Sequence, residues 1–113
     1  MLEVLTNIAQ NAADAIKQER SYGKIEIEGQ FNYGHKYFDL LVIDDGVGIA
    51  EKDLQHVFRP YFTTKLTGRN YGLGLTYCKN VMKKHGGDIY IEQAHNGGTL
   101  VKLRLPIKRI NFL

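Results

Sequence analysis

This sequence has little cysteine and no long hydrophobic run, the two features that would indicate disulfide bonds or a membrane span. Its 113 residues contain one cysteine, Cys78, which excludes an internal disulfide and favours a reducing compartment. No apolar run approaches the length needed to cross a bilayer, and the first residues lack the pattern of a signal peptide. We therefore expect one cytoplasmic domain over residues 1–113 that does not itself contact a membrane, whether or not its parent protein is membrane-anchored.

Charge is likewise modest. The chain is 43% hydrophobic and 24% charged, as in ordinary soluble proteins, and its formal net charge is +3. This bias suits an anionic ligand but does not argue for nucleic acid. We expect the isolated domain to be a monomer that does not bind nucleic acid.

Hydrophobic periodicity and turn residues predict two long helices that alternate with two hairpins. The first helix has apolar positions at helical spacing: Leu5, Ile8, Ala9, Ala12, Ala15 and Ile16. The predicted elements are helices at 2–17, 51–57 and 72–85, strands at 24–32, 36–43, 88–93 and 99–105, and a loop or lid at 59–71. This order predicts an α/β fold, a two-layer sandwich whose mixed, mostly antiparallel sheet is covered by helices on one face.

A polar stripe runs along the first helix. Glu3, Asn7, Asn11 and Asp14 share one face at helical spacing. Asparagine is a poor helix former, so two on one stripe need a reason. An amide oxygen can coordinate a hard cation such as Mg²⁺ without adding charge. A plain solvated face is the alternative.

Two glycine-containing segments are candidate ligand-binding elements. The D-D-G-V-G-I run at 44–49 follows an apolar strand, and its glycines allow a close backbone approach while Asp44 can accept a hydrogen bond from an amino group. The G-L-G-L run at 72–75 opens a helix, where free N–H groups favour phosphate. An ordinary turn and tight packing are the respective alternatives. Neither segment matches G-x-G-x-x-G or the P-loop pattern.

In combination, these segments resemble the ATP-binding catalytic domain of sensor histidine kinases. N-I-A-Q-N-A-A-D-A at 7–15 is similar to the family's N box, and D-D-G-V-G-I at 44–49 to its G1 box. F-R-P-Y-F-T-T-K at 58–65 is similar to the F box of nitrogen-regulation-type kinases, and G-L-G-L at 72–75 to the G2 box. The motifs come in the family's order and span nearly the whole chain.

The resemblance implies the Bergerat fold of gyrase-type, Hsp90-type and mismatch-repair ATPases, with ATP and Mg²⁺ as cofactors. It implies that Asn11 holds Mg²⁺, that Asp44 accepts a hydrogen bond from the adenine amino group, and that 59–71 form a mobile ATP lid. The implied cofactor-binding residues are Asn11, Asp44, Gly46, Gly48, Phe58, Lys65, Gly72, Leu73 and Gly74, and the implied catalytic residues are Asn7, Asn11 and Lys65.

The implied reaction is transfer of the γ-phosphoryl group of Mg-ATP to a histidine on a separate dimerisation domain, which then serves a response regulator. The four histidines of this chain lie in no recognisable phosphoacceptor context. A serine kinase of the anti-sigma-factor type and a non-catalytic nucleotide-binding module are the alternatives. In related hydrolysing ATPases a glutamate precedes the metal-binding asparagine by one turn. The amide of Asn7 stands there and cannot act as a base, so we expect slow hydrolysis.

Two positions depart from the family pattern. Asn70 stands where a glycine is usual, and Tyr71 is bulkier than the usual small residue. The chain also starts almost at the N box, where the family usually has a preceding strand. This suggests a domain trimmed at its N-terminus.

Overall fold

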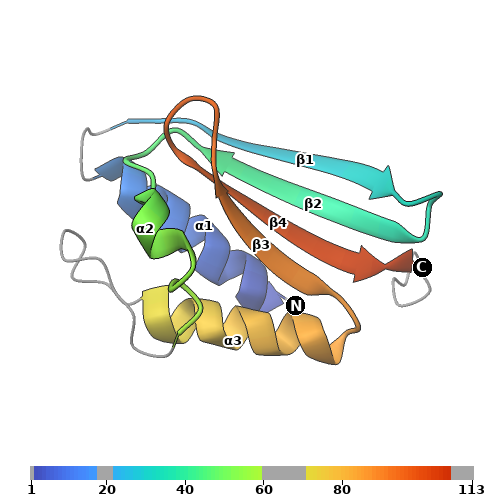
Figure 1. The fold of residues 1–113 in the computed structure, drawn as a ribbon. Coiled ribbons are helices and arrows are strands. Elements are labelled where there is room, and N and C mark those ends of the chain that lie inside the picture. Colours follow the sequence, from blue (N-terminus) through green and yellow to red (C-terminus); the bar gives the residue numbers. More distant parts are fainter. Residues whose placement is uncertain (1, 18–21, 60–70, 108–113) are drawn as a thin grey trace.

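A computed structural model describes residues 2–17, 22–59 and 71–107 (Figure 1). The elements are α1 (Leu2–Lys17), β1 (Ile25–Asn32), β2 (Tyr37–Asp44), α2 (Glu51–Leu54), α3 (Tyr71–Lys84), β3 (Asp88–Gln93) and β4 (Thr99–Pro106). The order of helices and hairpins is the predicted one. None of the helices in these ranges has the length and hydrophobicity that crossing a bilayer requires.

The described strands form one sheet in the order β1-β2-β4-β3, and each neighbouring pair is antiparallel. Helices α1 and α3 lie side by side on one face of this sheet (Figure 1). The opposite face carries no described helix. The structure thus confirms the predicted two-layer sandwich with helices on one face, and β4 reaches its central place by pairing with β2 rather than with β1.

The core lies between the two helices and strands β2, β4 and β3. Alternation along the strands places the registered pair Val42 and Val101 on the helix side, and their neighbours follow at every second position. Helix α3 contributes an apolar stripe at helical spacing that includes Cys78. The fully buried side chains are Val4, Val57, Leu75, Cys78, Met82, Ile89 and, on the other face of the sheet, Asp39.

The buried face of α1 is rotated slightly from the prediction. Val4 is fully buried and Ala9 is exposed, whereas the sequence pattern had placed Ala9 inside and had not singled out Val4. The face that packs consists of Val4, Ile8, Ala12 and Ala15, because α1 lies against β2 and α3 at once. The prediction for Ala9 was therefore wrong, since periodicity alone cannot choose between neighbouring apolar stripes.

Edge strand β1 stays outside this core. Ile25, Ile27 and Phe31 alternate as a strand should, yet each is exposed. Helix α1 packs on β2 and does not extend over β1. Helix α2 is also shorter than predicted, because the chain after Leu54 tightens into turns in which His56 N–H bonds to Asp53 O at 2.9 Å.

Candidate functional site

A mostly apolar cavity lies between α1, the start of α3 and the helix-facing side of the sheet. Apolar side chains form most of its wall, with a few polar groups among them, as is common in ligand-binding sites. The lining residues are Ile8, Asn11, Ala12, Val42, Asp44, Ile49, Leu75, Ile91, Thr99 and Val101. The structure therefore brings the two predicted polar residues, Asn11 and Asp44, to one cavity from α1 and the end of β2.

Asp44 is a buried carboxylate that the backbone holds in place. Its Oδ1 accepts hydrogen bonds from the N–H groups of Gly46 at 2.9 Å and Thr99 at 3.4 Å. Its Oδ2 has no hydrogen-bond partner among the described residues. Burial raises the pKa of Asp44, the two backbone hydrogen bonds oppose this rise, and the neighbouring charge of Asp45 adds to it. The site thus offers one fixed acceptor oxygen at the end of β2.

The glycines after Asp44 stand where the chain packs against other backbone. A β-carbon on Gly46 would lie 2.6 Å from the carbonyl carbon of Ala15, and the N–H of Val47 donates to Ala15 O at 3.3 Å. Gly48 has a φ of +76°, and a β-carbon there would overlap the carbonyl oxygen of Gly97. Because glycine has no β-carbon, the turn can pack closely between the end of α1 and the loop that joins β3 to β4.

The predicted polar stripe of α1 is divided between two environments. The Nδ2 group of Asn7 donates to the carbonyl oxygen of Glu3 at 3.0 Å, and its Oδ1 would lie 3.3 Å from a β-carbon on Gly74. The carboxylate of Glu3 accepts a hydrogen bond of 3.1 Å from the hydroxyl of Tyr77. Glu3 and Asn7 therefore face α3, while Asn11 faces the cavity one turn further along.

The end of the same stripe is not part of the cavity. Asp14 accepts a hydrogen bond of 3.0 Å from Gln10, its neighbour one turn back on α1. The pattern in the sequence was real, but only its third member, Asn11, lines the cavity.

The glycines predicted to open a helix do so. Gly72, Leu73 and Gly74 lie in the first turn of α3, and the next residue, Leu75, lines the cavity. Gly74 also permits the close approach of Asn7 described above. The N-terminus of α3 is therefore adjacent to the cavity wall.

Phe58 lies beside the cavity rather than in its wall. Its half-buried side chain packs against the core, Lys79 Nζ stands 4.9 Å from its ring centre, and its carbonyl oxygen accepts a hydrogen bond of 2.9 Å from Thr76. Lys65 and the rest of the predicted lid between Arg59 and Tyr71 lie outside the described residues.

Sequence reasoning missed several residues that line the cavity. Thr99 is 7% exposed and holds Asp44 through its N–H group. The G-G-T sequence at 97–99 was a usable signal, because a glycine turn there delivers a small polar residue to the start of a strand. Among the apolar lining residues, Ile91 and Val101 carried no signal beyond their hydrophobicity, whereas Ile8, Ile49 and Leu75 stand within the motifs that resemble the family's boxes.

Comparison with known proteins gives a consistent result. The model of the "Histidine kinase-, DNA gyrase B-, and HSP90-like ATPase" family matches residues 1–109. Sensor histidine kinase ZraS of Salmonella typhimurium is 36% identical over 107 residues, which are 95% of this chain and 22% of that protein. Sporulation kinase D of Bacillus subtilis is 35% identical over 106 residues, 93% of this chain and 19% of that protein. The chain thus spans about a fifth of the length of these relatives.

Solved structures show the same relationship. The mycobacterial sensor histidine kinase MprB superposes with a TM-score of 0.76 at 27% identity, over 92% of this chain and 68% of that one. The catalytic domain of histidine kinase ThkA superposes with a TM-score of 0.73 at 33% sequence identity, over 91% of this chain and 62% of that one. Histidine kinase ThkA in complex with response regulator protein TrrA superposes with a TM-score of 0.71 at 32% sequence identity, over 91% of this chain and 27% of that one. The chain has the Bergerat fold and belongs to the family of histidine kinase-, DNA gyrase B- and HSP90-like ATPases, as an ATP-binding catalytic domain of the sensor histidine kinase type.

Proposed function

We propose that this domain binds Mg-ATP in the cavity between α1 and α3 and donates the γ-phosphoryl group to a histidine on a separate domain of its parent kinase. The observation that supports this proposal most directly is the hydrogen bonding of the two carboxylate oxygens of Asp44. Two backbone N–H groups hold its Oδ1, while Oδ2 is left to accept a hydrogen bond in a mostly apolar cavity. A buried acceptor of this kind suits the exocyclic amino group of adenine.

Selectivity for adenine follows from the same geometry. The walls contributed by Ile49, Ile91 and Val101 suit the faces of a flat aromatic base. Guanine presents a carbonyl oxygen where adenine presents its amino group. That oxygen would oppose the Asp44 carboxylate, so we expect ATP to bind in preference to GTP.

Asn11 is the proposed protein ligand for Mg²⁺. Its amide supplies an oxygen ligand at the cavity from the middle of α1. Among the described residues, no group of three or more His, Cys, Asp or Glu side chains could hold an ion. Mg²⁺ commonly combines one or two protein ligands with substrate phosphates and water. A nucleotide that brings its phosphates to Asn11 would therefore complete such a site.

The phosphate chain is assigned to the first turn of α3. Its N–H groups at Gly72, Leu73 and Gly74, together with the helix dipole, favour an anion next to the cavity. Lys65 is the proposed cationic side chain toward the phosphates. Phe58, which packs against α3 through Thr76, is proposed to support this end of the site.

Asn7 is proposed to orient the site rather than to activate water. Its Nδ2 group bonds to the carbonyl oxygen of Glu3 within α1, and its Oδ1 lies close to Gly74, so the side chain stands where α1 meets the start of α3. An amide has no basic lone pair at neutral pH. Glu3, the carboxylate at the start of the stripe, lies two turns from Asn11, roughly 12 Å along the axis, and accepts a hydrogen bond from Tyr77. Asp14, at the other end of the stripe, accepts a hydrogen bond from Gln10 and does not line the cavity. We therefore expect slow ATP hydrolysis by the domain alone.

Phosphoryl transfer depends mainly on positioning and on stabilising charge. In the proposed reaction this domain binds the nucleotide and metal, and the dimerisation domain supplies the histidine imidazole that accepts the phosphoryl group. A response regulator would then receive the phosphoryl group from that histidine. These partners belong to the longer parent protein and its pathway.

The test is phosphotransfer in a two-component mixture. The chain is incubated with γ-labelled ATP and Mg²⁺, alone and with a histidine-bearing hairpin from a related kinase, and Asp44→Asn is the matched variant. Acid-labile label on the hairpin, reduced in the variant, is the expected result. Acid-stable label on a serine partner would indicate the anti-sigma-factor type, rapid phosphate release would indicate an autonomous ATPase, and ATP binding without transfer would indicate a regulatory module.

A further inference from the structure

A second cluster of polar and aromatic residues lies on the sheet face opposite the helices. Leu103 and Leu105 of β4 point toward the helix layer, so Arg104 between them points to the other side. Its register partners are Asp39 on β2 and Asp88 on β3. A row of charged residues therefore crosses three strands at the end of the sheet that lies far from Asp44.

The centre of this row is a buried ion pair. Asp39 is fully buried, and its two oxygens accept hydrogen bonds of 2.8 Å each from Nε and Nη2 of Arg104. Asn32 on β1 donates to the same carboxylate. The hydrogen bond from Arg104 is the main cause that holds the pKa of Asp39 below its usual value. Replacing a buried ion pair by apolar residues often leaves stability unchanged, so stability alone does not call for this arrangement.

Aromatic rings surround the guanidinium group of Arg104. Its Cζ lies 4.8 Å from the ring centre of Tyr33, 5.7 Å from Tyr37 and 5.5 Å from Tyr90. The outer rings reach solvent, since Tyr33 is 64% exposed and Tyr90 is 39% exposed. We call these four residues, Tyr33, Tyr37, Tyr90 and Arg104, the Arg104 surface. Tyrosine and arginine are among the residue types enriched at the sites that contribute most to binding energy in protein interfaces.

The hairpin between β1 and β2 holds Tyr33 over Arg104 in an unfavourable backbone conformation. Tyr33 has a φ of 55° and His35 a φ of 66°, in the left-handed region that bulky residues rarely adopt. The Tyr33 hydroxyl is an acceptor for Nη1 of Arg104 at 3.5 Å. Strained residues of this kind concentrate at binding sites, because surrounding contacts must hold them there.

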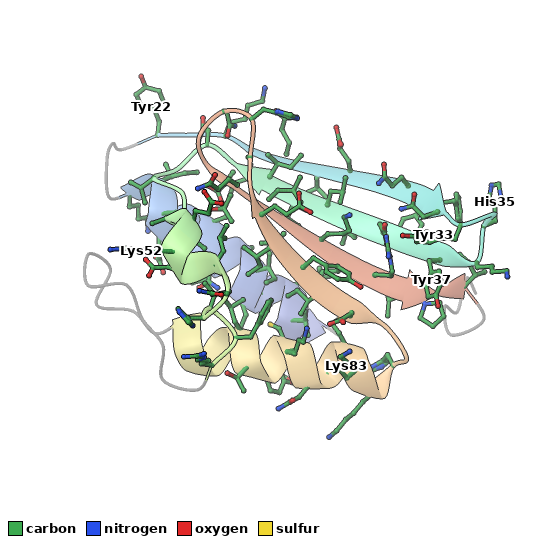
Figure 2. All side chains as sticks on the ribbon, in the orientation of Figure 1. Tyr22, Tyr33, His35, Tyr37, Lys52 and Lys83 are labelled. Carbon is green, nitrogen blue, oxygen red and sulfur yellow. The ribbon has the colours of Figure 1, made fainter. Side chains whose placement is uncertain are left out.

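An open cavity of about 400 Å³ adjoins the Arg104 surface. Its other walls are Gly86, Gly87 and Asp88, at the turn from α3 into β3. Figure 2 shows Tyr33 and Tyr37 at the hairpin end and Lys83 near the end of α3, toward the same end of the molecule. The cavity is thus framed by two segments that are distant in sequence.

At the α3 end of this cavity, two lysines surround one carboxylate and leave a net positive charge. Asp88 has a side chain only 19% exposed, and Lys79 at 2.8 Å and Lys83 at 2.9 Å pair with it. The Lys83 side chain is itself 58% exposed, and Lys36 is exposed on the hairpin. The exposed acid on this face of β3, Glu92, stands two residues beyond Tyr90, roughly 7 Å away.

We propose that the Arg104 surface is a docking site for an acidic segment of a partner protein. A carboxylate of that segment would enter the cavity toward the outer edge of Arg104 and the tyrosine hydroxyls, while its neighbours would lie near Lys83 and Lys36. Pairing with Asp39 fixes the guanidinium plane beforehand, which limits the entropy lost when a carboxylate binds. The surface is separate from the nucleotide cavity, so this proposal does not rest on the one above.

The test is a nuclear magnetic resonance titration of the ¹⁵N-labelled chain with two capped decapeptides, alternating Glu-Ala and alternating Gln-Ala. The Glu peptide is expected to shift the amide signals of Tyr33, Tyr90 and Arg104, less so as salt is raised, while the Gln peptide leaves them in place. The variant Tyr33→Ala with Tyr90→Ala should weaken binding at least tenfold, and Tyr22→Ala, which removes a 77% exposed tyrosine elsewhere, should not.

Neither tyrosine variant replaces Asp39 or Arg104, and the amide spectra of both report whether the fold persists. The proposal is overturned if the Glu peptide at millimolar concentration leaves the Arg104 surface unshifted, or if the Gln peptide shifts it equally. Undiminished binding by the double variant would overturn it as well. Asp44→Asn should leave the peptide titration unchanged, which separates this result from the nucleotide proposal.

Discussion

The backbone N–H of Thr99 donates a hydrogen bond of 3.4 Å to Oδ1 of Asp44, across 55 residues of sequence. Gly98 makes this contact possible, since a β-carbon there would overlap the carbonyl oxygen of Asp44 and lie 3.0 Å from its Oδ1. The carboxylate is therefore oriented by the protein before any ligand arrives. A preorganised acceptor gives up less entropy on binding than a mobile one.

Substituting Asp44 by Asn should weaken ATP binding. The amide would lose the charge and could present a donor to the adenine amino group. Hydrogen bonds to charged groups contribute about 1.5–3 kcal/mol, so the affinity should fall about tenfold or more. Isothermal titration calorimetry measures this directly. Asp45→Asn is the matched control, because that carboxylate accepts the N–H of Lys24 at 2.9 Å and does not line the cavity. Equal affinities for the wild type and Asp44→Asn would remove Asp44 from the site.

Substituting Asn11 by Ala should separate metal recognition from base recognition. One oxygen ligand is lost, so the gain in nucleotide affinity on adding Mg²⁺ should shrink by roughly tenfold, equivalent to about 1.4 kcal/mol. Affinity without Mg²⁺ should change little. A non-hydrolysable ATP analogue is titrated with and without the metal, and Gln10→Ala, on the exposed neighbouring position, is the control. An undiminished metal effect in Asn11→Ala would refute the assignment.

Acid should destabilise the fold partly through Asp39. Its folded-state pKa lies below the usual 3.8, mainly because Arg104 donates to it. The unfolded chain therefore takes up the proton first, so the stabilisation is complete above the unfolded-state value and is lost as pH falls through the folded-state value. Asp39→Asn should lower the free energy of unfolding at pH 7 by about 3 kcal/mol, as expected when one partner of a buried pair is removed.

Urea unfolding at pH 7 and at about pH 3 checks this prediction. The difference in stability between the wild type and Asp39→Asn should narrow at the lower pH. Glu28→Gln, at an exposed position on β1, serves as the control. A difference that is the same at both pH values would mean that the carboxylate charge does not stabilise the fold.

Cys78 should react slowly with thiol reagents in the native protein. It is fully buried on α3, and burial raises the pKa of its thiol from 9.0 to about 11. At pH 8 this difference alone leaves about 100-fold less thiolate, and burial slows the reagent further. Labelling with Ellman's reagent is compared between the native chain and the chain in denaturant. Rapid native labelling would show that the packing of α3 on α1 opens readily.

The sequence alone predicted the architecture and the main motifs. Helical spacing along 2–17, alternation of Ile25 and Ile27 within 24–32 and the N-G-G turn at 96–98 are local signals, and each specifies its element without reference to the rest of the chain. Asp44 could be singled out in the same way, because a carboxylate followed by glycines at a strand end is visible in a few residues. Its role as a ligand for adenine stays a prediction.

Only the tertiary structure decided which distant residues meet. Asp44 is held by Thr99, Asn7 faces Gly74, and Asp39 pairs with Arg104, which is 65 residues away. These contacts depend on β4 pairing with β2 in one register, and period-2 alternation determines the face of a side chain but not the strand opposite it. The same limit explains Ala9, because the stripe of α1 that is buried depends on where β2 and α3 lie. Local chemistry therefore determined the kinds of element and the candidate groups, and the order of the strands determined how those groups are combined.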